Sequence, residues 1–446
     1  MKKLNILMIL LCFVGFSHGQ AAWDGTTKTP VKPNGLKYVI TTPAQLAWVA
    51  EACATDETAR EFEGKDVIID ADLDLGNKEW TPIGSLEHPF KGHLIGNNHK
   101  IKNLKVTQAS MENVGLFGYI QGQSSIHAKV DSIYVIGSTI TGGNNVGVLC
   151  GSAFNTEFVH CGIQTATING VSNVGGLIGM LKNSTVFISY AKGMTITVSH
   201  EWGGLFVGYN DSTFQSTFKI SNCYAKGKMT CANHGGGFVG YNGVKGNIEH
   251  CYCIIQFAGK VADCKNLGLF CSVNEHTAKL NNCVYNSNVN GNMTTLAVQE
   301  NRNDIEEQVD VWNSTKDGMT ALNFFSNFTS DQGARDKWKQ DFDLKAGTGF
   351  SINEGTPILL WEYYANVGVK EAKEVSVSVY PNPVRNTLFV KTNAPVQKLE
   401  MMDLLGKTML VEESVESVDM SQFRAGIYLI RITTDQGTVT QKVIKQ

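Results

Sequence analysis

The chain has little charge of either sign and little proline. Lys, Arg, Asp and Glu together make up 18% of its 446 residues, the formal net charge is −3, and there are 9 prolines. With no basic stripe and no acidic tail, the charge pattern excludes nucleic acid as an expected partner. The 45 glycines, beside so few prolines, are typical of short strands and tight turns rather than of long helices.

Long apolar runs are missing beyond the N-terminus. Residues 1–19 predict a signal peptide, because two lysines precede the apolar run Leu4–Phe16 and because Ser17 and Gly19 are small residues before a cleavage at Gln20. The run itself is too short to span a bilayer, and no later segment is long and apolar enough. We therefore expect no transmembrane segment in the mature chain.

Cysteine is missing from the C-terminal part of the chain. Ten cysteines follow the predicted signal peptide, and all of them lie between Cys53 and Cys283. An exported protein can oxidise such residues to disulfides, but their pairing cannot be deduced from sequence. The cysteine-free remainder predicts a domain boundary near residue 290.

A Gly-aliphatic-Gly phrase recurs six times between these limits, with its first glycines 28 to 33 residues apart. These glycines are Gly115, Gly147, Gly175, Gly203, Gly236 and Gly268. A second phrase of alternating apolar and polar residues, typical of a strand, runs in phase with it. A period of about 30 residues indicates a stacked array in which each unit buries its apolar edge on its neighbours. Because the units are rich in glycine and β-branched residues, we predict an all-β chain built around a parallel β-helix, or β-solenoid.

Equivalent residues of such an array stack above one another. Four cysteines occupy the same place in the second phrase, namely Cys161, Cys223, Cys251 and Cys283. We expect them to form a buried column of thiols rather than disulfides between neighbours, since cysteine packs as a small hydrophobe. His160 and His250 immediately precede two of them, which predicts a side-chain ladder rather than a unique site.

The repeated phrases resemble a known motif. Gly175–Gly179 (GGLIG) and Gly203–Gly208 (GGLFVG) are similar to the GLUG motif of bacterial surface proteins, and the similarity covers roughly Tyr38 to Cys283. Ile95 departs from the pattern, because the family usually has an acidic residue there. The resemblance implies a GLUG-repeat solenoid over residues 20–292. Residues 293–366 are expected to form a mixed cap and a linker, since an open solenoid end would expose apolar core.

Residues 367–446 have a different pattern. Short alternating strands separated by turn signals predict a small immunoglobulin-like β-sandwich. Its linking phrases resemble the type A C-terminal sorting domain of type IX secretion cargo. The residues that carry this resemblance are Tyr380, Pro381, Asn382, Pro383, Gly406, Lys407, Gly426, Tyr428 and Lys442. The resemblance implies that an outer-membrane translocon is a partner. It also implies a route through the periplasm to the cell surface or the medium.

Candidate chemistry is sparse. His200-Glu201-Trp202 lacks the second histidine of a zinc-protease motif, so no zinc site is predicted. Asp70, Asp72 and Asp74 alternate with apolar residues and share one strand face, where they are weak calcium candidates or, more simply, a solvated outer face. No cofactor is expected.

The expected function is therefore non-enzymatic, with adhesion or binding of a glycan or host protein along the solenoid. A β-helix polysaccharide lyase or hydrolase is the first alternative, and a structural surface spacer is the second. An acidic cleft with convergent carboxylates would favour the enzyme. A face lined by Asn, Thr and Tyr would favour adhesion, and the spacer predicts neither aromatic nor acidic patches.

Overall fold

The computed structural model describes residues 21–54, 62–123, 127–212, 218–257, 264–286, 297–301, 309–314, 337–339, 358–359, 362, 377–392, 396–403, 408–413, 416–434 and 437–446. The predicted signal peptide lies outside these residues. The chain divides into two compact units, residues 1–363 and 364–446, which are described separately below.

The first unit begins with short strands and one helix. Strand β1 (Lys37–Ile40) leads into helix α1 (Pro43–Ala52), which the sequence analysis did not predict. Thr42 caps this helix, since its hydroxyl accepts from the Gln45 N–H while the Gln45 side chain accepts from the Thr42 N–H. Strands β2 (Asp66–Ile69) and β3 (Leu73–Asp74) follow, and β2 pairs in parallel with β1.

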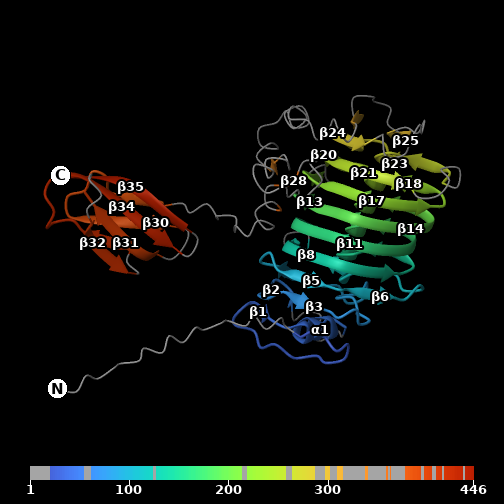
Figure 1. Ribbon diagram of the computed structural model, residues 1–446, viewed down its shortest axis with the longest axis horizontal. Helices are drawn as coiled ribbons and strands as arrows, with labels where there is room; N and C mark the ends of the chain where they lie inside the picture. Colours follow the sequence, from blue (N-terminus) through green and yellow to red (C-terminus); the bar gives the residue numbers. More distant parts are fainter. Residues whose placement is uncertain are drawn as a thin grey trace, which may run out of the picture. The chain divides into compact units, whose positions relative to one another are not determined.

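The chain then winds through stacked coils in the order of the sequence (Figure 1). The strands before residue 182 are β4 (His93–Ile95), β5 (Lys100–Lys102), β6 (Lys105–Thr107), β7 (Phe117–Gln121), β8 (Ala128–Thr141), β9 (Asn144–Gly147), β10 (Cys150–Phe154), β11 (Thr156–Gly175) and β12 (Ile178–Lys182). The later ones are β13 (Thr185–Phe187), β14 (Tyr190–Gly204), β15 (Val207–Asp211), β16 (Ile220–Ser221), β17 (Tyr224–Cys231), β18 (His234–Gly236), β19 (Val239–Asn242), β20 (Asn247–Glu249), β21 (Tyr252–Phe257), β22 (Asn266–Gly268), β23 (Cys271–Asn274), β24 (Lys279–Asn286), β25 (Val298–Asn301) and β26 (Val309–Ser314).

The strands pair in parallel from coil to coil. A seven-stranded sheet has the order β25-β23-β19-β15-β12-β10-β7, with one strand from each successive coil, and the remaining strands form a 19-stranded sheet around the other sides. This confirms the predicted parallel β-solenoid. The pairing continues past residue 292, because β25 and β26 join β23 and β24 and add a further coil.

One interior runs through all the coils, and aromatic residues stack in it as columns. Phe206, Phe238 and Phe270 lie in three successive coils with ring centroids 4.7 and 5.1 Å apart. The four column cysteines are fully buried, and none of them forms a disulfide, as predicted. Burial raises the pKa of the Cys161 and Cys251 thiols in the column and of the neighbouring Cys253 thiol outside it, so the reactivity of these thiols is suppressed.

The residue before each column position adopts a left-handed backbone. Its φ lies between 48° and 56° in six coils, at Ser132, His160, Ile188, Asn222, His250 and Asn282. Asn and His are enriched in this conformation, which explains why the two predicted ladder histidines recur at this place. The position is a coil corner. His250 Nε2 lies 3.4 Å from Asn282 Nδ2, the next member of the row, as a ladder predicts, whereas His160 Nδ1 lies 3.6 Å from Asp131 Oδ1.

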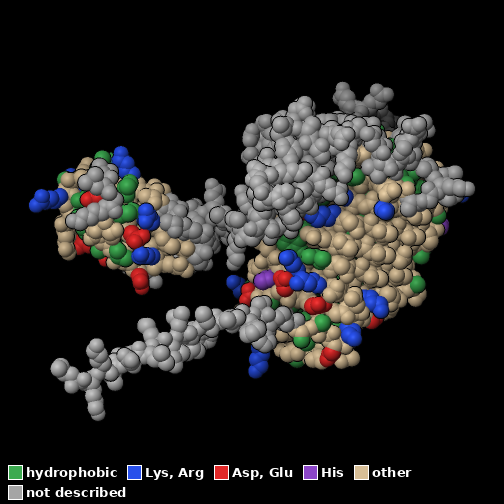
Figure 2. Space-filling view, in the orientation of Figure 1, with side chains coloured by type: hydrophobic (Ala, Val, Ile, Leu, Met, Phe, Trp, Pro, Cys, Tyr) green, Lys and Arg blue, Asp and Glu red, His purple; other side chains and the backbone are tan. Residues whose placement is uncertain are grey.

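Charge is sparse on the broad face formed by β8, β11, β14 and β17. Figure 2 shows that face covered largely by uncharged polar side chains and backbone. Thr139, Thr167 and Thr195 are register partners on it, and all three are exposed. Cross-strand threonine pairs of this kind stabilise a solvated sheet surface.

The described residues of the expected cap pack against the side of the coils. Trp338 is buried against Tyr224 and Tyr252, at 6.2 and 5.6 Å between ring centroids. The Glu362 carboxylate is fully buried, accepts a bond from the Tyr224 hydroxyl at 2.7 Å and pairs with Lys192 Nζ at 2.5 Å. These residues therefore cover a tyrosine column in the middle of the solenoid. Beside them, β27 (Trp338–Lys339) pairs with β28 (Ile358–Leu359).

The second unit consists of two antiparallel sheets. The first is three-stranded, with β29 (Val377–Tyr380), β30 (Thr387–Thr392) and β33 (Ser417–Asp419). The second is four-stranded, with β32 (Thr408–Glu413), β31 (Val396–Met402), β34 (Gly426–Thr434) and β35 (Gly437–Lys445). A separate small core lies between them, as expected for a small β-sandwich. No helix within the described residues is long and apolar enough to cross a membrane.

Candidate ligand groove and sorting signal

A ladder of asparagine side chains follows one edge of the solenoid. Asn113, Asn145 and Asn173 stand at the start of three successive repeat phrases, with φ of 57°, 58° and 55°. Asn145 Nδ2 donates to Asn113 Oδ1 at 3.0 Å, and Asn173 Nδ2 donates to Asn145 Oδ1 at 2.7 Å. The left-handed backbone explains the residue type, since asparagine tolerates it better than most side chains.

Trp202 takes the next place in this row. Its φ is 63°, an unfavourable conformation for a bulky residue. Its ring stacks on His234 at 4.2 Å and meets Tyr241 edge-on at 4.8 Å. Because tryptophan has no amide group there, Asn173 Oδ1 is buried without a hydrogen-bond partner among the described residues. The substitution thus costs backbone strain and a hydrogen bond at one position.

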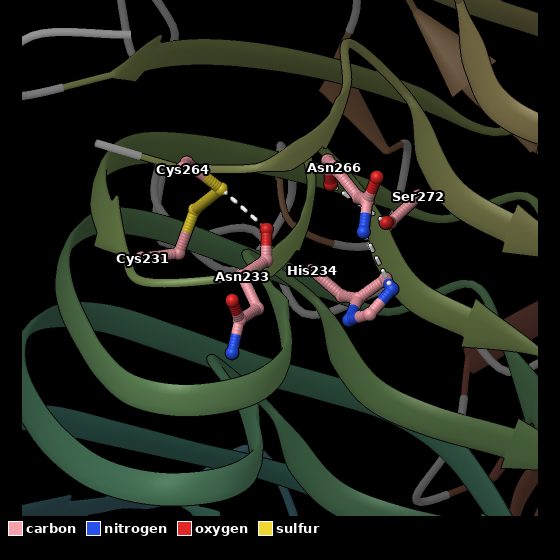
Figure 3. Close-up of a disulfide and its surroundings, with 6 residues drawn as sticks. All are labelled: Cys231, Asn233, His234, Cys264, Asn266 and Ser272. Carbon is pink, nitrogen blue, oxygen red and sulfur yellow. Dashed lines mark hydrogen bonds between the residues drawn. A yellow bond between two sulfur atoms is a disulfide. The ribbon is translucent and has the colours of Figure 1, made fainter. Parts of the chain in front are cut away.

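The row members after Trp202, His234 and Asn266, again make a polar contact with each other. His234 Nε2 lies 2.9 Å from Asn266 Nδ2 in the following coil, as Figure 3 shows. A disulfide joins Cys231 to Cys264 just before these two residues, with Cα atoms 5.4 Å apart and a sequence separation of 33. It links neighbouring coils beside the row. The sequence left this pairing open, and it falls outside the four-cysteine column.

Around Trp202 lies an open groove of about 670 Å³. Its lining consists of Glu112, Asn144, Asn145, Val171, Ser172, Asn173, Met180, His200, Glu201, Trp202 and Tyr209. The lining includes two carboxylates, several amides and two large aromatic rings, and among the described residues no lysine or arginine contributes to it. Parallel register places Asn144, Ser172 and Glu201 in one row across three coils.

A second aromatic stack borders the groove. Tyr209 and Tyr241 lie face to face in neighbouring coils, with ring centroids 4.6 Å apart and planes within 7°. Partial burial, helped by the charge of Asp211, raises the pKa of Tyr209, so its phenol is a neutral donor at physiological pH. Sequence reasoning did not select Trp202 or Tyr209. The available signal was the replacement of asparagine by tryptophan at the start of one repeat phrase.

The three candidate calcium ligands do not come together. Asp72 and Asp74 alternate with buried leucines, as the strand pattern predicted, and Asp70 is exposed. Burial alone would raise the pKa of Asp72, but a backbone N–H, Lys102 and His99 lower it. Among the described residues, no group of three or more His, Cys, Asp or Glu side chains is placed to hold a metal ion.

The predicted sorting residues line one edge and one corner of the second unit. Asn382 Nδ2 donates to the Lys442 carbonyl at 2.8 Å, and Asn382 Oδ1 accepts from the Ile444 N–H at 2.9 Å. Val384 continues this pairing along β35, which is the edge strand of its sheet. The Tyr380–Val384 phrase, in which both X–Pro bonds are cis, therefore covers an exposed strand edge.

The other sorting residues occupy three different settings. The Tyr428 hydroxyl donates to the Arg424 carbonyl at 2.9 Å and closes a corner at the start of β34. Gly426 is exposed, and a Cβ built on it would meet no atom closer than 3.9 Å. Tyr380 is 50% exposed and stacks on Phe389 at 5.7 Å. Lys442 is exposed, whereas Gly406 and Lys407 lie outside the described residues.

The second unit matches a known protein family. Residues 378–446 match the secretion system C-terminal sorting domain. The type IX sorting resemblance is thereby confirmed, and the chain is an exported protein that is secreted or held at the cell surface. The domain also implies an interaction with the secretion system.

Two relatives share sequence with part of the chain. Halomucin of Haloquadratum walsbyi is 30% identical over 178 residues, which is 36% of this chain and 2% of that protein. A putative Gly-rich membrane protein of Evansella cellulosilytica is 29% identical over 145 residues, 29% of this chain and 15% of that protein. The chain thus spans a small fraction of the length of these relatives. No solved structure matches it.

Proposed function

We propose that the exported protein is a non-enzymatic binding protein whose solenoid holds an extended glycan in the groove around Trp202. The GLUG-like repeats serve, in this proposal, as a rigid stack that presents one binding edge at the surface. Repeat arrays commonly bind along such extended edges, because neighbouring units repeat the same contacts.

The position of Trp202 carries the proposal. The three preceding coils have asparagine in this row, which satisfies the left-handed backbone and continues the amide ladder. Tryptophan neither suits the left-handed backbone nor continues the amide ladder, and part of its ring remains accessible in the groove. Strain and lost hydrogen bonds of this kind are typical of positions selected for function rather than for stability.

The chemistry of the groove suits a sugar chain. Trp202 and Tyr209 offer flat apolar surfaces with a polar tip, on which pyranose rings can pack. The amides of Asn144 and Asn145 offer donors and acceptors for hydroxyl groups. The groove is open along the coils, so a chain can lie across several of them.

The spacing of the carboxylates argues against the hydrolase alternative. Glu112 Oε1 accepts from Asn144 Nδ2 at 3.1 Å, and Asn144 is followed in register by Ser172 and Glu201. At about 4.8 Å per coil, three coil spacings place the backbone positions of Glu112 and Glu201 about 14 Å apart. A glycosidase pair needs about 5 to 9.5 Å. The spacer alternative predicts no accessible aromatic cluster, and the groove contains one.

Glycan-array binding of the secreted full-length protein tests the proposal, with Trp202→Asn as the diagnostic variant. Asparagine is the residue of the three preceding coils, so this variant should keep the backbone while removing the platform. Binding should fall at least tenfold, as expected for loss of an aromatic hot spot. Thr167→Asn on the uncharged face is the matched control and should bind like the wild type. A blank array together with measurable depolymerisation of a polysaccharide would contradict the proposal.

A further inference from the structure

We propose that the groove selects glycans built from amino sugars whose amines are free and protonated. This inference rests on the binding function proposed above and adds the chemical class of the ligand. It derives from the charge and hydrogen-bonding capacity of the groove lining rather than from its aromatic residues.

The groove is acidic. Within the part of the chain that the structure describes, Glu112 and Glu201 line it, and no Lys or Arg does. His200 and Tyr209 are its other titratable side chains, His200 Nδ1 lies 3.3 Å from Ser172 Oγ, and His234 stacks on Trp202. Two carboxylates at a surface with low-dielectric walls attract cations and repel anionic chains.

Glu201 is the better placed of the two carboxylates. It directly precedes Trp202, and its side chain keeps 34% of its surface exposed. His234 Nδ1 is 4.0 Å from Glu201 Oε1, which is beyond hydrogen-bond distance and at the outer limit of an ion pair when His234 is protonated. A carboxylate accepts several hydrogen bonds, so Glu201 retains capacity for an ammonium group on a sugar that packs on Trp202.

The rest of the lining adds acceptors rather than cations. The Glu112 carboxylate accepts one amide bond from Asn144 while remaining exposed, so it keeps accepting capacity for a ligand. A ligand rich in N–H donors satisfies such a surface, whereas N-acetylation removes the charge of the amine and uronic acids introduce repulsion.

The separation of the carboxylates predicts a preference for longer chains. The backbone positions of Glu112 and Glu201 lie three coils apart, which is about 14 Å. Only a ligand of several sugar units can bring one ammonium group to each carboxylate at the same time. Simultaneous contacts of this kind raise affinity without a new type of interaction.

Calorimetric titration of the secreted full-length protein with three oligosaccharide series tests the inference. The probes are β-1,4-glucosamine oligomers, their fully N-acetylated counterparts of equal length, and galacturonate oligomers. We expect the free-amine series to bind at least tenfold more tightly than the acetylated series, and the galacturonates not to bind. Added salt should weaken the free-amine binding most.

Glu201→Gln separates the two proposals. It keeps the size and polarity of the side chain and removes only its charge, so it should lower free-amine affinity to about the level of the acetylated series. Glu157→Gln, outside the groove, is the matched control and should have no effect. Equal binding of both series, or unchanged binding by Glu201→Gln, would overturn the amine inference and leave the binding function standing. If no array glycan binds and Trp202→Asn changes nothing, both proposals fail.

Discussion

The two units of this protein reveal their specialised residues in opposite ways. In the solenoid each position recurs in the next coil, as in the stacked column of Phe206, Phe238 and Phe270. In the C-terminal sandwich no position recurs, and a small core of unique contacts holds two antiparallel sheets together.

This difference determines what counts as an unusual residue. In the solenoid a specialised residue is one that departs from its row, as Trp202 departs from the asparagines before it. In the sandwich it is a residue whose type packing does not require, such as the exposed Gly426. Aligning the coils reveals the first kind. The second kind is revealed by open space beside a residue, where packing does not restrict the residue type.

The largest expected effect follows from removing the second unit. Deletion of residues 367–446 removes the sorting unit and should abolish export across the outer membrane, while the solenoid still folds because its core is separate. Cell fractionation and surface protease accessibility measure the outcome, with the full-length chain as control. Normal surface delivery of the truncated protein would contradict the sorting role.

The second prediction compares one glycine of the solenoid with one glycine of the sandwich. A Cβ at Gly236 in the solenoid would lie 1.8 Å from the Val239 carbonyl oxygen, whereas a Cβ at Gly426 would meet nothing closer than 3.9 Å. Gly236→Ala should therefore lower the free energy of unfolding of the solenoid by several kcal/mol, which is at least the usual cost of inserting an extra methyl group into a packed core. Gly426→Ala should fold normally.

Denaturant unfolding of the secreted proteins measures the glycine effects, and export yield gives Gly426→Ala a second readout. If Gly426→Ala folds but is not exported, the open space beside Gly426 serves recognition. Equal stability of the Gly236→Ala variant and the wild type would show that the turn from Gly236 to Val239 can open to accept a methyl group.

The repeat period was enough to predict the solenoid, because stacking makes one local pattern decide the whole architecture. The buried cysteine column followed from the same logic. Helix α1 was not predicted, although Thr42, Pro43 and Gln45 form a helix-start pattern, because the prediction rested on the alternation typical of strands. The extra coil formed by β25 and β26 was missed because their segments carry no copy of the glycine phrase.

The long-range contacts could not have been predicted. Trp338 bonds to Asn222 across 116 residues, and Glu362 pairs with Lys192 across 170. Nothing local in either segment specifies such a partner. The groove was hidden for a related reason, because its lining comes from residues that are adjacent only after successive coils are placed in register.

The smallest expected effect comes from one tyrosine hydroxyl in each unit. Tyr224 donates to the buried Glu362 carboxylate at 2.7 Å, and Tyr428 donates to the Arg424 backbone carbonyl at 2.9 Å. Replacement of either by phenylalanine removes one hydrogen bond and keeps the ring. A bond to a charged group contributes about 1.5 to 3 kcal/mol and a neutral one about 1 kcal/mol, so Tyr224→Phe should cost more.

All seven tryptophans precede residue 364, so their fluorescence reports on the first unit alone. Hydrogen exchange of peptides from β34 and β35 reports on the second. Each substitution should change only its own unit, since the two cores are separate. Equal costs would show that Lys192 already satisfies Glu362, and that the charged acceptor adds nothing to the attachment of this segment on the solenoid.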